Sequence, residues 1–178
     1  FTEETVYDSS VSLMQRDRNT DDIYISYSTP KTPSRTFIYN LKTKEKKLVK
    51  EQIIPSGHNS NDYIVERLEC EGHDGRIIPI TITRKKTTKL DGNSNLLLYG
   101  YGSYGNSMWP SFSSTRLSLI NRDIIWATAH IRGGMERGMK WWKEGKLLNK
   151  KNTFQDYISC AKFLIDKKYT SKKKIIGM

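Results

Sequence analysis

The apolar run Leu96–Tyr99 and the glycines that follow it constrain the fold of this chain most. A short apolar run bounded by turn residues is typical of a strand buried on both faces, as in a parallel sheet. Gly100, Gly102 and Gly105 come directly after it, and glycine lets the backbone take positive φ angles and approach other groups closely. Because ligands of open α/β sheets bind at the carboxyl ends of the strands, we expect this turn to be functional.

The three glycines also match the G-x-G-x-x-G pattern of dinucleotide-binding sites. In that motif the last glycine opens a helix whose N-terminus binds the pyrophosphate. Here Gly105 precedes a segment, residues 106–110, that does not begin an amphipathic helix, and the next predicted strand ends at His130 rather than at a carboxylate that could bind a ribose. The sequence therefore predicts no dinucleotide cofactor, and no other cofactor or metal site is expected. A purely structural turn is the remaining alternative.

Predicted strands and helices alternate from Leu90 onwards. Strands are expected at Leu96–Tyr99, at Ile124–Ala129 and from Ile175, with a helix at 114–121 and a helix or turn at 135–143. A longer helix should begin at Thr153, because Thr153 and Asp156 have capping-box spacing. Its apolar face should consist of Phe154, Tyr157, Ile158, Ala161, Leu164 and Ile165. This alternation predicts an α/β fold with a parallel sheet and right-handed crossovers.

The first part of the chain predicts a different structure. Short alternating runs at 23–28 and 37–41, followed by 47–50, indicate an antiparallel meander. Residues 55–62 form a turn-rich linker, so we expect one domain over 1–54 and another over 63–178. In the second domain, 72–75 should form a hairpin turn. Ile78, Ile80 and Ile82 should share one face of the strand after it, and Pro79 predicts that this strand lies at a sheet edge.

Composition narrows the range of functions. The formal net charge is +11, which suggests nucleic-acid binding, but the basic residues are spread over four segments rather than along one stripe, so we expect them to be solvated. No apolar run approaches the roughly 20 residues that cross a bilayer. Cys70 and Cys160 lack metal-ligand spacing and are expected to be free thiols in a reducing cytoplasm. The initial Phe1, which is not Met, suggests a piece of a longer protein.

Several longer motifs occur in a fixed order: Leu98–Gly105, Arg116–Ser118, Ala129–Gly134 with Glu136, Trp142, and Gly145–Phe154. This series closely resembles the prolyl oligopeptidase-type serine peptidases and, among them, oligopeptidase B, which cuts short peptides after Arg or Lys. The resemblance implies that 1–54 are the end of a β-propeller-like domain and that 63–178 are the N-terminal half of an α/β-hydrolase domain. It implies a short peptide as substrate, with neither nucleic acid nor membrane as a partner.

The resemblance assigns one catalytic role within these residues. Tyr101 is expected to donate its hydroxyl to the tetrahedral oxyanion, a role that a phenol on a glycine-braced turn suits. Aromatic packing on the sheet end is the alternative for Tyr101. His130, Arg132 and Glu136 are expected to be structural, His58 and His73 to be solvated in turns, and Tyr99 and Tyr104 to be packing residues.

The catalytic Ser, Asp and His are not expected within these residues. An α/β-hydrolase carries its nucleophile in a G-x-S-x-G turn, and this pattern does not occur in the sequence. Ile175–Met178 resembles the strand that leads into that turn, so the serine is expected shortly beyond Met178. The chain alone is therefore expected to be inactive. Alternatives are a split enzyme whose companion chain carries the rest of the domain, a non-catalytic remnant, and a basic nucleic-acid-binding protein.

Overall fold

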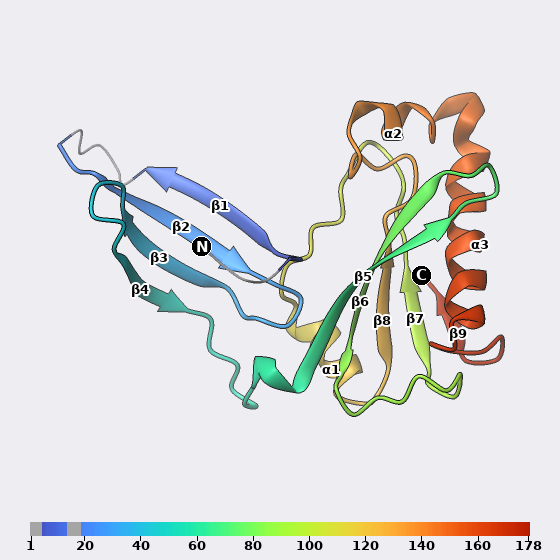
Figure 1. The fold of residues 1–178 in the computed structure, drawn as a ribbon, viewed down its shortest axis with the longest axis horizontal. Helices are drawn as coiled ribbons and strands as arrows, with labels where there is room; N and C mark the ends of the chain where they lie inside the picture. The colour runs from blue at the N-terminus through green and yellow to red at the C-terminus, as the bar shows by residue number, and fades with distance from the viewer. Residues whose placement is uncertain (1–4, 14–18) are drawn as a thin grey trace. The chain divides into compact units, whose positions relative to one another are not determined.

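The computed structural model describes residues 5–13 and 19–178. The chain divides into two compact units. The first unit consists of Phe1–Ser60 with Trp109–Ser114, and the second of Asn61–Met108 with Thr115–Met178. Each unit has its own sheet and is described by itself (Figure 1).

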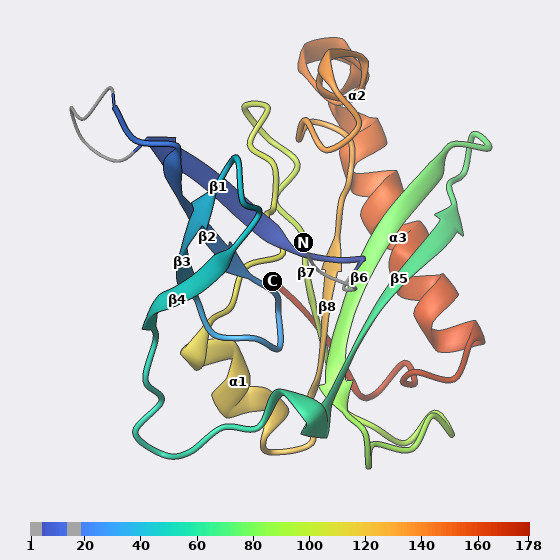
Figure 2. The same cartoon turned by 60° about the vertical axis from the view of Figure 1, so that its left-hand side comes forward.

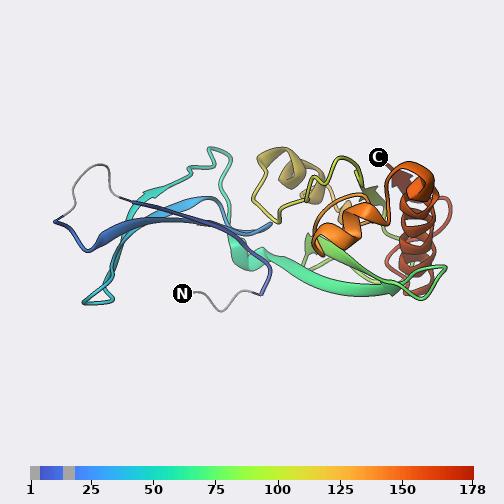
Figure 3. The same cartoon turned by 90° about the horizontal axis from the view of Figure 1, so that it is seen from above.

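The first unit is built on an antiparallel sheet of four strands in the order β1-β2-β3-β4. Their bounds are β1 Asp8–Leu13, β2 Asp22–Ser28, β3 Arg35–Asn40 and β4 Lys46–Glu51. The sheet is a single layer, which Figure 3 shows from its edge. The predicted meander corresponds to β2, β3 and β4, whereas β1 was not predicted because its sequence is mostly Ser and Asp, without apolar alternation.

His58 lies in this unit and corrects one expectation. We expected it to be solvated, but its Nε2 lies 2.6 Å from the carbonyl oxygen of Lys31. Its ring also meets the ring of Phe112 edge-on, with 5.3 Å between centroids. These contacts bury part of the imidazole and join the segment before the 3₁₀ helix η1 (Ser60–Asp62) to the rest of the unit.

The second unit is built on a five-stranded mixed sheet in the order β5-β6-β8-β7-β9. Strand β7 is parallel to β8 and β9, and β6 is antiparallel to both β5 and β8. The elements, in chain order, are β5 Tyr63–Glu71, β6 Ile77–Lys85, β7 Leu96–Tyr99, α1 Ser114–Ile120, β8 Ile125–Ala129, α2 Met139–Lys143, η2 Leu147–Asn149, α3 Lys150–Asp166 and β9 Ile175–Gly177. The α/β alternation predicted from Leu90 onwards is therefore present. In the described residues, no helix is long and apolar enough to span a membrane.

Helices cover both faces of this sheet (Figure 2). Ile78, Ile80 and Ile82 of β6 form one core with Cys160 and Leu164 of α3. On the opposite face, Arg116 of α1 lies over the ring of Trp126. Full burial of one large aliphatic side chain contributes about 1.5–3 kcal/mol, so the core beneath α3 holds the sheet against that helix.

The expectation that Pro79 marks an edge strand is wrong, because β6 pairs with β5 on one side and with β8 on the other. The carbonyl of Pro79 accepts a hydrogen bond from the His130 amide on the β8 side, just beyond the last residue of β8, Ala129. The N–H and C=O of a strand residue point to the same side. An N–H on Pro79 would therefore point to the β8 side, beyond the last paired residue of β8. Its absence costs the sheet no hydrogen bond.

The first turn of α3 also differs from the expectation. The helix begins at Lys150 with Asn149 as its N-cap, so Thr153 lies inside the helix and caps nothing. The side chains that α3 buries are Thr153, Asp156, Cys160 and Leu164. Phe154 and Ile158, predicted for the apolar face, are 60% and 44% exposed. The buried face of the helix therefore differs from the predicted one. Thr153 and Asp156 face inward because they bind polar groups at the end of the sheet.

Candidate active site

Two loops meet at the carboxyl ends of the parallel strands β7 and β8. Gly102, in the loop after β7, has a φ of +59°, and a Cβ on it would lie 2.7 Å from Cγ1 of Ile131 in the loop after β8. A Cβ on Gly133 would overlap the carbonyl oxygen of Gly102. The amide of Gly105 donates to the carbonyl of Gly133 across 2.9 Å. Glycine is required here because the two backbones touch.

Tyr101 lies on the first of these loops, between Gly100 and Gly102, and is 41% exposed. Within the part of the chain that the structure describes, its hydroxyl has no hydrogen-bond partner. A phenol held on a braced turn with an unused donor can stabilise a developing negative charge without reorganising. Tyr101 lies at the end of the sheet where ligands of α/β folds bind.

The neighbouring tyrosines have different environments. Tyr99 stacks on the ring of Trp126, with 6.1 Å between centroids, and is a packing residue as expected. The same expectation is wrong for Tyr104, which is 85% exposed with a φ of +55°. Tyr104 lines a cavity of about 480 Å³, together with Ser103, Gly133, Trp142, Gly145, Lys146, Leu147 and Lys150. This cavity lies next to the loop that carries Tyr101.

Lys150, the first residue of α3, joins that helix to the Tyr101 loop. Its Nζ donates to the carbonyl oxygen of Gly102 at 2.6 Å and to Oγ of Ser103 at 2.8 Å. Burial lowers the pKa of Lys150. Sequence reasoning missed this residue because it lies in a basic segment that was expected to be solvated. The only signal was its position in the Gly145–Phe154 motif.

Arg132 is the buried charge that holds the loop after β8. Its Nε and Nη2 donate to the carboxylate of Asp156 at 2.8 and 2.6 Å, and its Nη1 donates to Asp74 at 2.6 Å. Burial by itself would lower the pKa of Arg132, but the hydrogen bonds to Asp156 and Asp74 raise it. The guanidinium therefore stays charged, in the structural role that the sequence predicts for it.

These carboxylates do not form a metal site. Ligand atoms of His73, Asp74 and Asp156 lie within 4.8 Å of one another. All four carboxylate oxygens of the two aspartates, however, accept hydrogen bonds from Arg132. A cation would have to displace the guanidinium, so the cluster is an ion-pair network.

His130 is buried, being 2% exposed. Its Nε2 lies 2.8 Å from both Nη1 of Arg67 and Oγ1 of Thr81, and its Nδ1 lies 3.5 Å from Glu136. Burial lowers the pKa of His130, and Nε2 facing an arginine donor requires a neutral ring with its proton on Nδ1. A histidine enclosed in this way cannot serve an incoming substrate, in agreement with the predicted structural role. Glu136 also accepts the amide of Met108, so it ties two loops together.

Comparison with known proteins shows which proteins the chain is similar to. Residues 110–178 match the model of the prolyl oligopeptidase family. The chain is 39% identical to dipeptidyl aminopeptidase BI of Pseudoxanthomonas mexicana over 99% of its own length and 24% of that protein. It is 37% identical to protease 2 of Moraxella lacunata over 97% of its own length and 25% of that protein.

Solved structures give the same result. Oligopeptidase B from Trypanosoma brucei matches with a TM-score of 0.91 and 32% identity, over 99% of this chain and 25% of that one. Prolyl oligopeptidase B from Galerina marginata matches with a TM-score of 0.87 and 30% identity, over 96% and 24%. These relatives are peptidases by name. Over most of its length the chain is similar to members of the prolyl oligopeptidase family, and it spans about a quarter of the length of the relatives it matches.

Proposed function

We propose that this chain is part of a serine-type oligopeptidase that hydrolyses short peptides, and that it contributes Tyr101 as an oxyanion donor. The observation that carries the proposal is the placement of Tyr101 on a turn braced by Gly102 and Gly133, with a free hydroxyl at the carboxyl end of β7. In the proposed assignment, residues 1–54 are the end of a β-propeller-like domain and residues 63–178 are the first half of an α/β-hydrolase domain. Residues 55–62 connect them.

In the proposed reaction a serine attacks the peptide carbonyl, and a histidine oriented by an acidic residue moves the proton. The carbonyl oxygen becomes negatively charged, and Tyr101 shares its stabilisation with a backbone amide. One such donor lowers the barrier by roughly 2.7–4 kcal/mol. The serine, the acid and the histidine are proposed to come from residues outside these 178. A donor without a nucleophile cannot form an acyl-enzyme, so this polypeptide alone is proposed to be inactive.

The proposed substrate is a short peptide cut after Arg or Lys. Support for a peptide comes from two relatives: prolyl oligopeptidase B of Galerina marginata is solved with a 25-residue macrocyclization substrate, and oligopeptidase B of Trypanosoma brucei with covalently bound antipain. Support for the basic preference is narrower and rests on the likeness to oligopeptidase B, because no acidic group that could select Arg or Lys was recognised in this sequence.

Active-site labelling tests this proposal. The 178-residue chain and the longest protein encoded by the reading frame that contains it would each be treated with a fluorophosphonate, which labels activated serines. We expect label on the longer protein only, with cleavage of peptides after Arg or Lys. Label on the 178-residue chain would refute its inactivity. Absence of peptidase activity from the longer protein, tested with any companion chain, would refute the proposed function. The chain would then be better explained as a non-catalytic remnant or as a nucleic-acid-binding protein, and salt-dependent binding would indicate the latter.

A further inference from the structure

We propose that Lys150 is a positioning residue for the oxyanion donor, and that its ammonium group fixes the turn that presents Tyr101. The inference rests on the proposed function, since it assigns a task to Lys150 only if Tyr101 stabilises an oxyanion. It assigns Lys150 a role that does not require contact with the substrate or the reacting atoms. Lys150 acts through the two residues that follow Tyr101.

The contacts are short and concentrated on the turn. Nζ of Lys150 lies 2.6 Å from the carbonyl oxygen of Gly102 and 2.8 Å from Oγ of Ser103. Hydrogen bonds from a charged donor are roughly twice as strong as those between neutral groups. Lys150 is also half-buried, so water competes less for its ammonium than at an exposed lysine. The turn is thereby held at the two residues that follow Tyr101.

The turn needs such a contact because its own sequence is flexible. Tyr101 has a glycine on each side, and glycine restricts the backbone less than any other residue. Gly102 also has a positive φ of +59°. An oxyanion donor works only when it lies about 2.7–3.1 Å from the charged oxygen, and a misplacement of about 1 Å can reduce a rate by about 100-fold. Restraint of the residues after Tyr101 therefore affects the reaction directly.

Lys150 itself is rigidly mounted. It is the first residue of a 17-residue helix. Within that helix, Thr153 donates to the carbonyls of Arg132 and Gly145, and Asp156 binds Arg132. The side chain of Asn152 donates to the carbonyl of Glu144. The first turn of α3 is thus fixed to the loops after β8 and α2, and Lys150 extends this network to the loop after β7.

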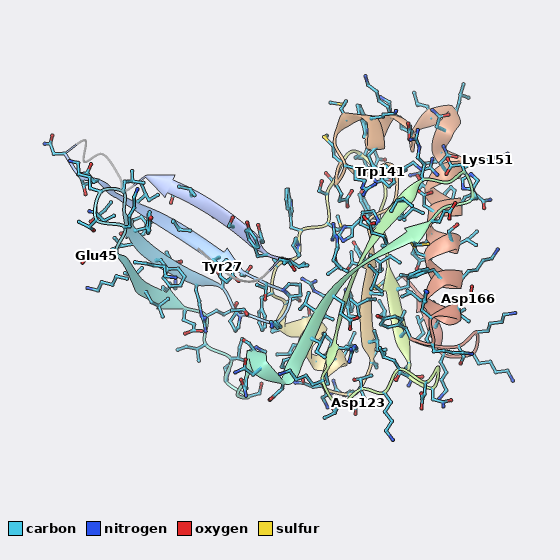
Figure 4. The ribbon with its side chains drawn as sticks, viewed as in Figure 1. Tyr27, Glu45, Asp123, Trp141, Lys151 and Asp166 are labelled. Atoms are coloured by element: carbon cyan, nitrogen blue, oxygen red, sulfur yellow. The ribbon has the colours of Figure 1, made fainter. Side chains whose placement is uncertain are left out.

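The neighbouring Lys151 supplies a matched control. It has the same charge and lies in the same turn of α3, but it is exposed (Figure 4). Replacement of either Lys150 or Lys151 by Met removes one positive charge from the first turn of α3. Only Lys150→Met removes the hydrogen bonds to Gly102 and Ser103.

The test measures kcat and KM for a short basic peptide, using the longest protein encoded by the reading frame, with any companion chain. We expect Lys150→Met to lower kcat by about 10- to 100-fold while KM stays within about twofold. Lys151→Met should leave both constants unchanged. Lys150→Arg, which keeps a charged donor, should retain more of kcat than Lys150→Met. If Lys150→Met does not fold, the loss of kcat in Lys150→Arg relative to a Lys151→Arg control replaces it.

A double variant separates positioning from a general structural role. Once Tyr101→Phe has removed the hydroxyl, Lys150→Met should reduce kcat further by no more than about threefold, because there is no donor left to position. Independent, multiplicative losses would overturn the inference, as would an unchanged kcat in Lys150→Met. If Tyr101→Phe itself leaves kcat unchanged, the proposed function fails instead, and the inference fails with it.

Discussion

The guanidinium of Arg132 and the carboxylate of Asp156 form a two-point ion pair inside the second unit, with side chains 1% and 0% exposed. The pair joins the loop after β8 to the second turn of α3, and Asp156 also accepts the backbone amide of Arg132 at 3.0 Å. The loop that packs on the Tyr101 turn is therefore held by a buried charge, and that charge has a partner from a helix.

Replacement of Asp156 by Asn should destabilise the second unit by about 3–5 kcal/mol, because it leaves the buried Arg132 without its fully buried counter-charge. Urea denaturation followed by tryptophan fluorescence measures this, since the ring of Trp141 lies 5.8 Å from the guanidinium. Asp166→Asn, at the exposed end of the same helix (Figure 4), should change stability by less than about 0.5 kcal/mol. Equal effects of the two variants would show that the Arg132 pair does not govern stability.

The environment of His130 predicts a pH dependence. Burial lowers its pKa from the ordinary value of 6.5, so the unfolded chain binds a proton at a higher pH than the folded chain does. The stability due to the neutral ring is therefore fully present above about pH 7 and falls as the pH drops, by at most about 1.4 kcal/mol per pH unit. The groups that face the ring are Arg67, Thr81 and Glu136.

The check is denaturation of the parent and of His130→Gln between pH 5 and 8. Gln keeps an acceptor for Arg67 and Thr81 but does not titrate. We expect the advantage of the parent over the variant to shrink as the pH falls below about 6.5. A constant difference across the range would mean that the ring of His130 takes up its proton equally in both states.

Periodicity and turn chemistry predicted the elements of the second unit that are local in sequence. Leu96–Tyr99 is a buried strand because its apolar run is short and ends at glycines, and α1 and β8 were predicted at nearly their observed positions. The likeness of the Tyr-Gly-Tyr-Gly turn and the motifs after it to a known family was enough to predict that family. These features depend on neighbouring residues only.

The partners of buried polar residues could not be predicted in the same way. Asp74 meets Arg132 across 58 positions in the sequence, and Lys150 meets Gly102 across 48. Periodicity assigns polar residues to the solvent side, so it placed Thr153 and Asp156 at a helix start and Lys150 among solvated lysines. Each of these side chains points inward because it forms hydrogen bonds with a residue distant in the sequence. The spacing of residues within one helix does not predict such contacts.

The hydroxyl of Thr153 provides a further test of the corrected start of α3. It donates to the carbonyls of Arg132 and Gly145 at 2.8 and 3.1 Å. Thr153→Val keeps the shape but leaves two buried carbonyls without this donor, so it should cost about 1–3 kcal/mol. Asn149→Ala, at the actual N-cap, should cost less, because the Asn149 side chain makes no capping hydrogen bond. A cost of Asn149→Ala equal to or above that of Thr153→Val in urea denaturation would show that the Thr153 hydroxyl does not hold the first turn of α3.

Gly133 and Gly138 allow backbone strain to be separated from steric overlap. Both have positive φ angles, +99° and +83°, but a Cβ on Gly138 would meet nothing within 4 Å, whereas a Cβ on Gly133 would overlap the carbonyl oxygen of Gly102. With a ψ of −171°, Gly138 occupies a backbone region that essentially only glycine adopts, so Gly138→Ala should cost this backbone strain alone, about 1–3 kcal/mol.

Gly133→Ala also places an alanine at a positive φ, +99°, and must in addition push the loop after β7 away from the loop after β8. We expect it to be less stable than Gly138→Ala by at least about 1 kcal/mol. In the longer peptidase proposed above, Gly133→Ala should lower kcat as well, because the displaced carbonyl belongs to Gly102, the residue after Tyr101. Urea denaturation and steady-state kinetics of the two variants measure these effects. Equal stabilities would mean that the two loops can separate freely, and the close packing behind Tyr101 would then have no part in holding it.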